Sequence, residues 1–312
     1  MKFLRRTLLG GIIIYVFALM IDIFISKSLL RSSLFTDELK VWNVILDDKI
    51  KNDEVLFFGS SRSLVHINPK IVKKEINVDS YNFGYNGQRL PLIKYRIDNC
   101  LKKDSIKNIV LILDDFSFQD DYIFKVDHLS PLLLYNKELY DIQGNVGYYS
   151  LIDVYVPLIR YLKNNEDFNW LHEVYKVYAY SKVREYRIRG YRKNDVRFKE
   201  STHSKSKTII EVNNNVFKKL DDLVNLSKKD DFNLIFVTSP TYIDELNRYS
   251  NHKEIINKIS NFSKDNNIIF FDYSEMKGFN NKKYFADSNH LNSQGADIFT
   301  KKLVEDIKPY LK

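Results

Sequence analysis

Two short stretches near opposite ends of the chain contain the residue types of a serine nucleophile and its base. Ser60 and Ser61 follow Gly59 and the apolar run 55–58, and Asp287 stands three residues before His290. An Asp at that spacing can orient the imidazole and fix its tautomer, which leaves the other ring nitrogen to take a proton from a serine hydroxyl. Brought together, these residues would perform acyl transfer through a serine ester.

Each stretch also has an ordinary structural interpretation. A serine after a strand and a glycine often only caps a helix, because its hydroxyl accepts a hydrogen bond from a free backbone N–H group. An Asp and a His three residues apart are common on protein surfaces. The chemical interpretation therefore requires that the two stretches meet in space.

The elements around the two stretches predict that meeting. Residues 55–58 form an unbroken apolar, β-favouring run, as expected of a parallel strand buried on both faces. The run at 267–273 predicts a last strand, which the loop with Asp287 and His290 follows before a closing helix at about 293–310. Loops that follow parallel strands lie at the carboxyl edge of the sheet, so both stretches should lie at that edge.

The remaining pattern alternates between strands and helices. Further strands are expected at 81–83, 108–113 and 233–238. Further helices are expected from about Asn68-Pro69 and at about 90–101, 209–228 and 253–264. This alternation predicts an α/β fold with three layers, in which helices cover both faces of a parallel sheet.

Two parts of the chain fall outside this alternation. Residues 118–207 are rich in tyrosine and show helical patterns at 149–163 and 168–188 without convincing strands, so we expect a helical insertion there. Residues 27–50 have the apolar spacing of a helical stalk. The α/β domain then extends over 51–312.

The N-terminus contains a candidate membrane anchor. Residues 7–26 are an apolar run of about 20 residues, which as a helix is about 30 Å long and matches the hydrocarbon thickness of a bilayer. Asp22 lies near its distal end, where we expect the carboxylate to reach the interface. A cleaved signal peptide is the alternative, but the run is longer than its usual apolar region and no small-residue cleavage site follows cleanly.

The charges beside the apolar run predict which of its ends faces the cytoplasm. The cations Lys2, Arg5 and Arg6 precede the apolar run, so residues 1–6 should stay in the cytoplasm and the remaining chain outside. Lys27 and Arg31 follow the run, so the excess of positive charge on its N-terminal side is small. The single cysteine cannot form an internal disulfide, so cysteine content does not indicate whether the domain lies inside or outside the cytoplasm.

The formal charge of +8 is concentrated in one segment. Residues 181–208 contain many more basic than acidic side chains and account for most of that charge. A solvated loop is one interpretation, and contact with anionic lipid headgroups or an anionic envelope polymer is the other. Nucleic acid is a poor partner for a segment expected outside the cell.

In their order along the chain, these motifs resemble the SGNH/GDSL hydrolase superfamily, over about 52–116 and 209–312. The resemblance makes Ser61 the nucleophile in the Gly-Ser-Ser turn. It assigns an oxyanion-hole glycine to the loop Asn82-Phe83-Gly84-Tyr85-Asn86-Gly87, where Gly87 fits better, and it makes His290 and Asp287 the base and its partner. It also implies a flavodoxin-like sheet.

The superfamily has a third sequence motif, here called the third block, directly after its third strand, and this chain departs from it. The resemblance expects an asparagine after the strand 108–113 that donates to the oxyanion, but Asp114 and Asp115 stand there. A carboxylate would repel an oxyanion, so either the hole contains only the backbone N–H groups of Ser61 and Gly87 or its third donor comes from elsewhere in the chain. Asp115 is a further candidate at the site. The departure, the anchor and the insertion are similar to membrane-anchored members that serve envelope-polymer acylation. Examples of such members are the D-alanyl transfer protein of teichoic acid modification and the alginate O-acetylation proteins, which work with a membrane-bound O-acyltransferase.

Other site types have less support. Asp114 and Asp115 are possible metal ligands, but no His or Cys lies nearby at ligand spacing, and we expect no metal and no cofactor. Gly84 and Gly87 lack the first glycine of a dinucleotide fingerprint. The other histidines have no partner apparent from sequence and are expected at the surface or in packing: His66, His128, His172, His203 and His252.

Two functions follow from these expectations. The first is an outward-facing serine acyltransferase or esterase that acts on acyl esters of an envelope polysaccharide or teichoic-acid-like polymer through an acyl-Ser61 intermediate. The second is a non-catalytic relative that binds polymer or assists assembly beside a membrane-bound O-acyltransferase. Labelling by a fluorophosphonate probe distinguishes them.

Overall fold

The structure is a computed structural model of the 312-residue chain. It describes residues 1–31, 41–42, 44–45, 50–51, 54–102, 106–118, 129–142, 149–162, 170–179, 187–200 and 207–312. The chain forms two compact units. One contains residues 1–47 and 123–185, and the other contains residues 48–122 and 186–312.

The second unit is built on a five-stranded parallel sheet. Its strands are β1 (Val55–Phe58), β2 (Ser80–Asn82), β3 (Asn108–Leu113), β6 (Asn233–Thr238) and β7 (Ile269–Asp272), in the spatial order β2-β1-β3-β6-β7. The predicted strands are present, with small differences at the ends of β2 and β7. This order is the flavodoxin-like one, with its switch point between β1 and β3.

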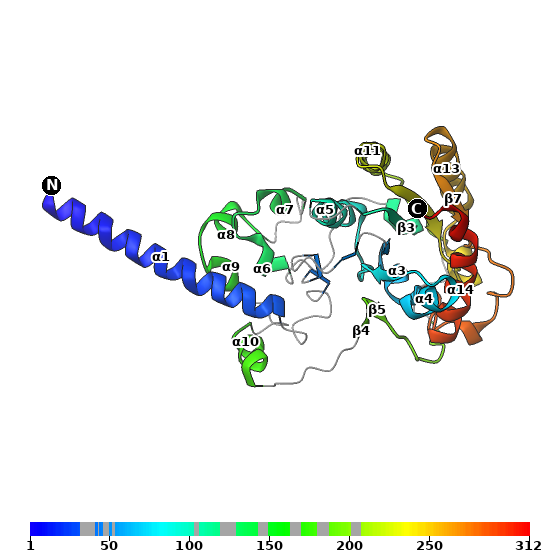
Figure 1. The fold of residues 1–312 in the computed structure, drawn as a ribbon, viewed down its shortest axis with the longest axis horizontal. Helices are drawn as coiled ribbons and strands as arrows, with labels where there is room; N and C mark the ends of the chain where they lie inside the picture. Colours follow the sequence, from blue (N-terminus) through cyan, green and yellow to red (C-terminus); the bar gives the residue numbers. More distant parts are fainter. Residues whose placement is uncertain are drawn as a thin grey trace. The chain divides into compact units, whose positions relative to one another are not determined.

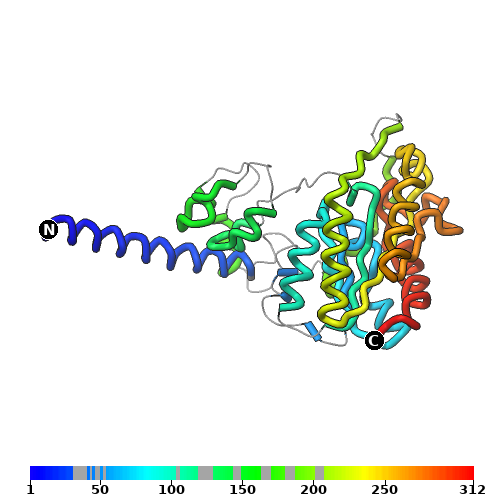
Figure 2. The backbone as a smooth tube through the Cα atoms, turned by 90° about the horizontal axis from the view of Figure 1, so that it is seen from above, coloured from blue at the N-terminus to red at the C-terminus, as the bar shows by residue number. Residues whose placement is uncertain are grey.

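Helices cover both faces of the sheet (Figures 1 and 2). One layer contains α3 (Ser61–His66), α4 (Pro69–Ile76) and α14 (Ser293–Ile307), and the other contains α5 (Leu90–Leu101), α11 (Asn214–Lys229) and α13 (His252–Asp265). A short helix, α12 (Ile243–Arg248), follows β6. The predicted three-layer α/β fold is confirmed.

The burial of both faces of the sheet explains why the strand sequences are continuous apolar runs. Successive side chains of a strand point to opposite faces, and both faces are covered here. Phe57 on β1 belongs to a buried cluster with Val110 on β3 and Phe299 on α14. On the opposite face, Phe236 of β6 lies with its ring 6.3 Å from that of Phe262 on α13.

The segment after Ser60 forms a helix, α3, ahead of the one predicted at Pro69, as the capping interpretation of the two serines allowed. The short helix α12 and a hairpin were not expected. A short antiparallel hairpin, β4 (Arg187–Ile188) and β5 (Tyr191–Arg192), lies in the segment expected to have no strands. Gly190 at its turn has a φ of +86°. The hairpin attaches to the edge strand, because Asn82 donates its backbone N–H to the carbonyl of Arg189 at 2.9 Å.

Some basic side chains of the segment 181–208 lie on the hairpin and form contacts within the α/β domain. Arg189 forms an ion pair with Glu54 at 2.6 Å, and Arg192 donates to Asn86 at 3.0 Å. Lys193 pairs with Asp195. Residues 181–186 and 201–206 lie outside the described residues. The polymer or headgroup contact of this segment stays a prediction.

The first unit contains a long helix and shorter ones from the predicted insertion. These are α1 (Lys2–Arg31), α6 (Ser130–Leu133), α7 (Lys137–Ile142), α8 (Leu151–Tyr155), α9 (Ile159–Leu162) and α10 (Trp170–Ala179). The single helix expected at 149–163 is two helices, since Pro157 lacks the N–H that a continuous helix needs and Leu158 has a φ of +68°.

Helix α1 is, among the described residues, the helix that is long and apolar enough to span a membrane, and a signal sequence would pass the same criterion. It extends beyond the predicted run at both ends. Asp22, expected to reach the interface, is instead buried against Arg160. Of the predicted stalk, residues 27–31 continue α1, and 41–42 and 44–45 are helical. Residue 50 is not helical, and the other stalk residues lie outside the described ones.

Candidate active site

A sharp turn joins β1 to α3. Gly59 has a φ of +154°, and a Cβ atom there would lie 2.8 Å from the carbonyl oxygen of Ile112, so this position favours glycine. Ser60 caps α3, because its Oγ accepts a hydrogen bond from the backbone N–H of Arg62 at 3.1 Å. The capping role foreseen for one of the two serines thus belongs to Ser60, which is buried. Ser61 is the first helical residue and is partly exposed.

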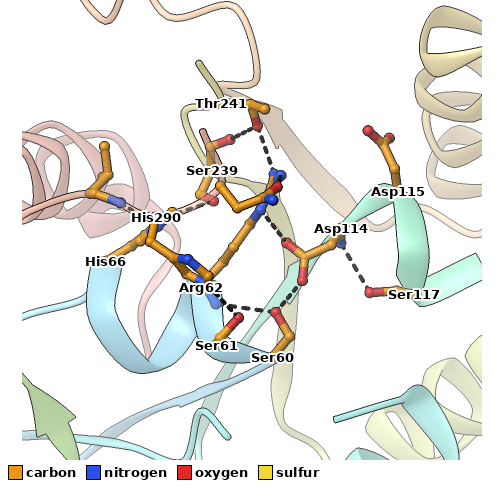
Figure 3. Close-up of polar contacts among 12 residues, drawn as sticks. Ser60, Ser61, Arg62, His66, Asp114, Asp115, Ser117, Ser239, Thr241 and His290 are labelled. Carbon is orange, nitrogen blue, oxygen red and sulfur yellow. Dashed lines mark hydrogen bonds and ion pairs between the residues drawn. The ribbon is translucent and has the colours of Figure 1, made fainter. Parts of the chain in front are cut away.

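Ser61, His290 and Asp287 form a continuous hydrogen-bonded row. His290 Nε2 lies 2.8 Å from Ser61 Oγ (Figure 3). On the other side of the ring, His290 Nδ1 lies 2.9 Å from Asp287 Oδ2 and 3.0 Å from Oδ1. The two sequence stretches therefore meet at the carboxyl edge of the sheet. This arrangement of a hydroxyl, an imidazole and a carboxylate can activate the hydroxyl as a nucleophile.

The loop before α14 presents His290 through local hydrogen bonds. Asp287 Oδ1 accepts the backbone N–H groups of Asn289 at 2.8 Å and of His290 at 2.9 Å. The carbonyl of His290 accepts the N–H of Ala286, and Phe285 forms a bridge with Leu291. This tight turn fixes the carboxylate beside the imidazole that follows it by three residues.

The same contacts determine the charge state of Asp287. Partial burial raises the pKa of this carboxyl, but the hydrogen bond and charge of His290 and the two backbone N–H groups outweigh burial, so the pKa falls below its ordinary value. Asp287 is therefore an ionised acceptor at neutral pH. An ionised carboxylate stabilises the imidazolium that forms when His290 takes the serine proton.

The loop with Gly84 and Gly87 lies against the nucleophile turn. Tyr85 donates its N–H to the carbonyl of Gly59 at 3.2 Å. Gly84 packs on α3 so closely that a Cβ atom would lie 2.2 Å from the backbone nitrogen of Leu64, which gives this glycine a packing role. Gly87 has a φ of +64° in the following turn. Its N–H as an oxyanion donor, like that of Ser61, stays a prediction.

Asp114 and Asp115, at the end of β3, have different surroundings. The Asp114 carboxylate accepts a hydrogen bond from Ser60 Oγ and lies 3.4 Å from Nε of Arg62. Burial raises its pKa, and the charge of Arg62 and the bond from Ser60 counter part of that rise. Asp115 points away from Ser61 in Figure 3 and contacts His252 Nδ1 at 2.9 Å. The geometry gives Asp115 no support as a substrate or oxyanion group.

Arg62 is a residue of the site that sequence reasoning missed. Its buried guanidinium donates from Nη1 to Thr241 Oγ1 at 2.6 Å and from Nη2 to Asn289 Oδ1 at 3.1 Å. It thus connects the helix that begins at Ser61, the segment after β6 and the loop of His290. An arginine after two serines looks like a surface cation, and no sequence signal reveals its distant partners.

His66 was expected at the surface or in packing, and it is a buried link of the same region. Its Nε2 accepts the N–H of Leu291 at 2.9 Å, so its Nδ1 carries the proton of the neutral ring and donates to Ser239 Oγ at 2.9 Å. Burial and the nearby charges of Arg62 and His290 hold the pKa of His66 well below its usual range. His66 therefore holds the loop of His290 as a neutral ring.

The other histidines are distributed over several parts of the chain. His252 pairs with Asp115, His172 is on α10, and His128 and His203 lie outside the described residues. Within the described ranges, no group of three His, Cys, Asp or Glu side chains is arranged to hold a metal ion.

No protein-family model matches this sequence, and no curated protein sequence matches it. Several solved structures are similar in fold at low identity. A GDSL-like lipase from Bacteroides thetaiotaomicron is 13% identical over 86% of this chain and 97% of its own, with a TM-score of 0.44. A member of the lipolytic protein G-D-S-L family from Veillonella parvula is 14% identical over 82% and 98%, with a TM-score of 0.43. The lipase/acylhydrolase from Enterococcus faecalis is 12% identical over 83% and 97%, with a TM-score of 0.41.

Proposed function

We propose that this chain is a membrane-anchored serine enzyme that transfers an acyl group from an ester through an acyl-Ser61 intermediate. The single observation that carries the proposal is the row of hydrogen bonds from Ser61 Oγ through His290 to Asp287. The buried neighbours of this row, Arg62 and His66, hold its two halves together. An exposed chance pair of Asp and His would not need such support.

The chemical steps follow from the placement of protons. His290 Nε2 takes the proton of Ser61 Oγ as the oxygen attacks the acyl carbon, and the ionised Asp287 stabilises the imidazolium. The tetrahedral oxyanion is held by the backbone N–H groups of Ser61 and Gly87. When the C–O bond to the leaving alcohol breaks, His290 returns the proton to that alcohol. The acyl-serine ester is then attacked by a second hydroxyl, and the same cycle of proton transfer releases Ser61.

The acceptor is proposed as a hydroxyl of a cell-envelope polysaccharide or teichoic-acid-like polymer, with water as the competing acceptor. This part rests on the resemblance of the anchor, the Gly-Ser-Ser turn and the altered third block to polymer-acylating proteins. A membrane-bound O-acyltransferase is the proposed source of the acyl group. We further propose that α1 anchors the acyltransferase or esterase in the cell membrane, with the α/β domain outside the cytoplasm.

A specific observation favours a second candidate. Two aspartates stand where the superfamily has its asparagine, and both carboxylates contact other side chains. Asp114 accepts a hydrogen bond from Ser60 and lies beside Arg62. Asp115 contacts His252. Neither can donate a hydrogen bond to an oxyanion as a carboxylate. A chain with a weakened oxyanion hole would be a non-catalytic protein that binds polymer or assists an O-acyltransferase.

Fluorophosphonate labelling of the full-length protein in detergent separates the two candidates. A serine enzyme forms a phosphonyl adduct that is lost in Ser61→Ala and retained in Ser60→Ala, the matched control at the neighbouring serine. Absence of any adduct on the unsubstituted chain supports the binding protein. Release of acetate or its transfer to a polymer from an acetyl ester then distinguishes esterase from transferase.

A further inference from the structure

A buried ion pair joins the apolar helix to the insertion. Arg160 donates from Nη1 to Asp22 Oδ2 at 2.6 Å and from Nη2 to Asp22 Oδ1 at 2.5 Å, and both side chains are fully buried. The backbone N–H of Leu158 donates to the same carboxylate at 2.6 Å. A charge in an apolar helix costs several kcal/mol in hydrocarbon unless it is paired, and this pair has the strong two-bond geometry of arginine and carboxylate.

Further hydrogen bonds between α1 and the insertion extend along nearly half of α1. Tyr15 Oη contacts Tyr135 Oη and donates to the carbonyl of Tyr155 at 3.3 Å. Toward the other end, Ser28 Oγ lies 2.9 Å from Tyr178 Oη on α10. The insertion therefore contacts α1 between Tyr15 and Ser28.

The length of α1 that remains is too short to cross a bilayer. Lys2 is the first residue of α1, and Tyr15 is the first residue of α1 with a hydrogen bond to the insertion among the described residues. The stretch between them rises about 20 Å, whereas the hydrocarbon of a bilayer is about 30 Å thick. Tilting the helix shortens its reach along the membrane normal and increases the difference. If α1 spans the membrane, part of the insertion must lie at the depth of the hydrocarbon.

The surface of α8 and α9 has the composition that this depth requires. Leu151 and Ile152 are 49% and 58% exposed, and Leu162 is 69% exposed. Residues 149–162 contain two charged side chains, Asp153 and Arg160, and both are buried. Asp153 accepts hydrogen bonds from the backbone N–H and hydroxyl of Ser150, so both charges have partners within the protein. This segment exposes apolar side chains and keeps its charges inside.

We propose that the segment 149–162, packed beside α1, is immersed in the lipid of the membrane leaflet next to the C-terminal half of α1. The inference rests on the proposed membrane anchor and is independent of the proposed acyl transfer. Lipid is the occupant because the exposed side chains of this segment are apolar, as those of α1 are, and because the remaining span is short by about 10 Å. The Asp22–Arg160 pair then joins two lipid-exposed elements from inside.

Spin labels on single cysteines measure the depth of this segment. The full-length chain is reconstituted alone in vesicles of phosphatidylethanolamine and phosphatidylglycerol, with Leu151→Cys and Ile152→Cys as separate variants. Ile13→Cys, on an exposed position of α1, is the lipid control, and Lys253→Cys, on an exposed position of α13, is the water control. The native Cys100 is buried, and the unsubstituted chain reports its background. Gel filtration in detergent checks that each variant is folded.

We expect collisions with oxygen, which concentrates in lipid, to exceed collisions with a water-soluble nickel chelate at 151 and 152. The ratio should lie near that at 13 and several-fold above that at 253. A ratio like that at 253 overturns the proposal, because the segment then faces water. Exclusion of both reagents also overturns it, because a second copy then covers the face. A water-like ratio at 13 would refute the anchor itself, and loss of fluorophosphonate labelling would refute only the proposed chemistry.

Discussion

The Nη2 group of Arg62 donates a hydrogen bond to Oδ1 of Asn289 at 3.1 Å. Arg62 follows the candidate nucleophile in the chain and Asn289 precedes the candidate base, so this bond joins the two halves of the site through their immediate neighbours. Arg62 also faces the buried Asp114 and donates to Thr241. It is a positioning residue, since its contacts are with the elements that hold Ser61 and His290.

Arg62→Lys should slow fluorophosphonate labelling of Ser61 about 10²-fold, because a small displacement of a reacting pair costs about that much. Lysine keeps the charge beside Asp114 but lacks the planar fork that reaches both Thr241 and Asn289. The melting temperature should change little. The comparison variant Arg62→Met leaves Asp114 unpaired and should cost about 3–5 kcal/mol of unfolding free energy. A normal labelling rate in Arg62→Lys would contradict the positioning role.

Asp287→Asn should reduce the labelling rate by about 10²–10⁴-fold, because an amide neither stabilises the imidazolium nor fixes the productive tautomer. A second readout follows from the lowered pKa of Asp287. A carboxyl with a lowered folded pKa stabilises the fold above its unfolded pKa of about 3.9, and that contribution disappears as pH falls through the folded pKa. The difference in melting temperature between the native chain and Asp287→Asn should therefore be constant above pH about 5 and shrink in stronger acid. A difference that grows on acidification would refute this assignment.

His66 should make stability depend on pH near neutrality. Because its folded pKa lies well below the unfolded value of about 6.5, the unfolded chain binds the proton more readily. Stability is then fully present above pH about 6.5 and falls on acidification, with a slope of at most about 1.4 kcal/mol per pH unit. The matched variant His66→Gln keeps a polar neutral side chain and should remove this slope. Urea unfolding at several pH values measures it, and an unchanged slope in His66→Gln contradicts the prediction.

Asp115→Asn should leave the rate of Ser61 labelling unchanged, because Asp115 contacts His252 and points away from the nucleophile. It should cost about 1–3 kcal/mol of unfolding free energy through the weakened buried hydrogen bond. Asp114→Asn is the comparison, since Asp114 binds Ser60 beside the nucleophile and faces Arg62. That variant should slow labelling. Slowed labelling in Asp115→Asn with normal labelling in Asp114→Asn would reverse the roles given to the two carboxylates.

The regular part of the fold could be predicted from the sequence. The bounds of β1, β3 and β6 agree with the apolar runs at 55–58, 108–113 and 233–238, because strands buried on both faces need continuous apolar, β-favouring residues. Helix α4 begins where Asn68 and Pro69 indicate. The short helix α12 and the β4–β5 hairpin were missed, since such short elements carry no periodic pattern and depend on their tertiary contacts.

Local turn chemistry and the alternation of strands and helices predicted that the two serines, Asp287 and His290 lie at one sheet edge. The resemblance to the SGNH/GDSL hydrolases then selected Ser61 over Ser60. The partners of Arg62, His66 and Asp115 became known only in the folded chain, and so did the pairing of Asp22 with Arg160. Periodicity and turn preferences are properties of neighbours in the chain, so sequence reports them directly. A buried charge is stabilised by whichever group the fold brings to it across a hundred residues or more, and that pairing is decided by three-dimensional packing alone.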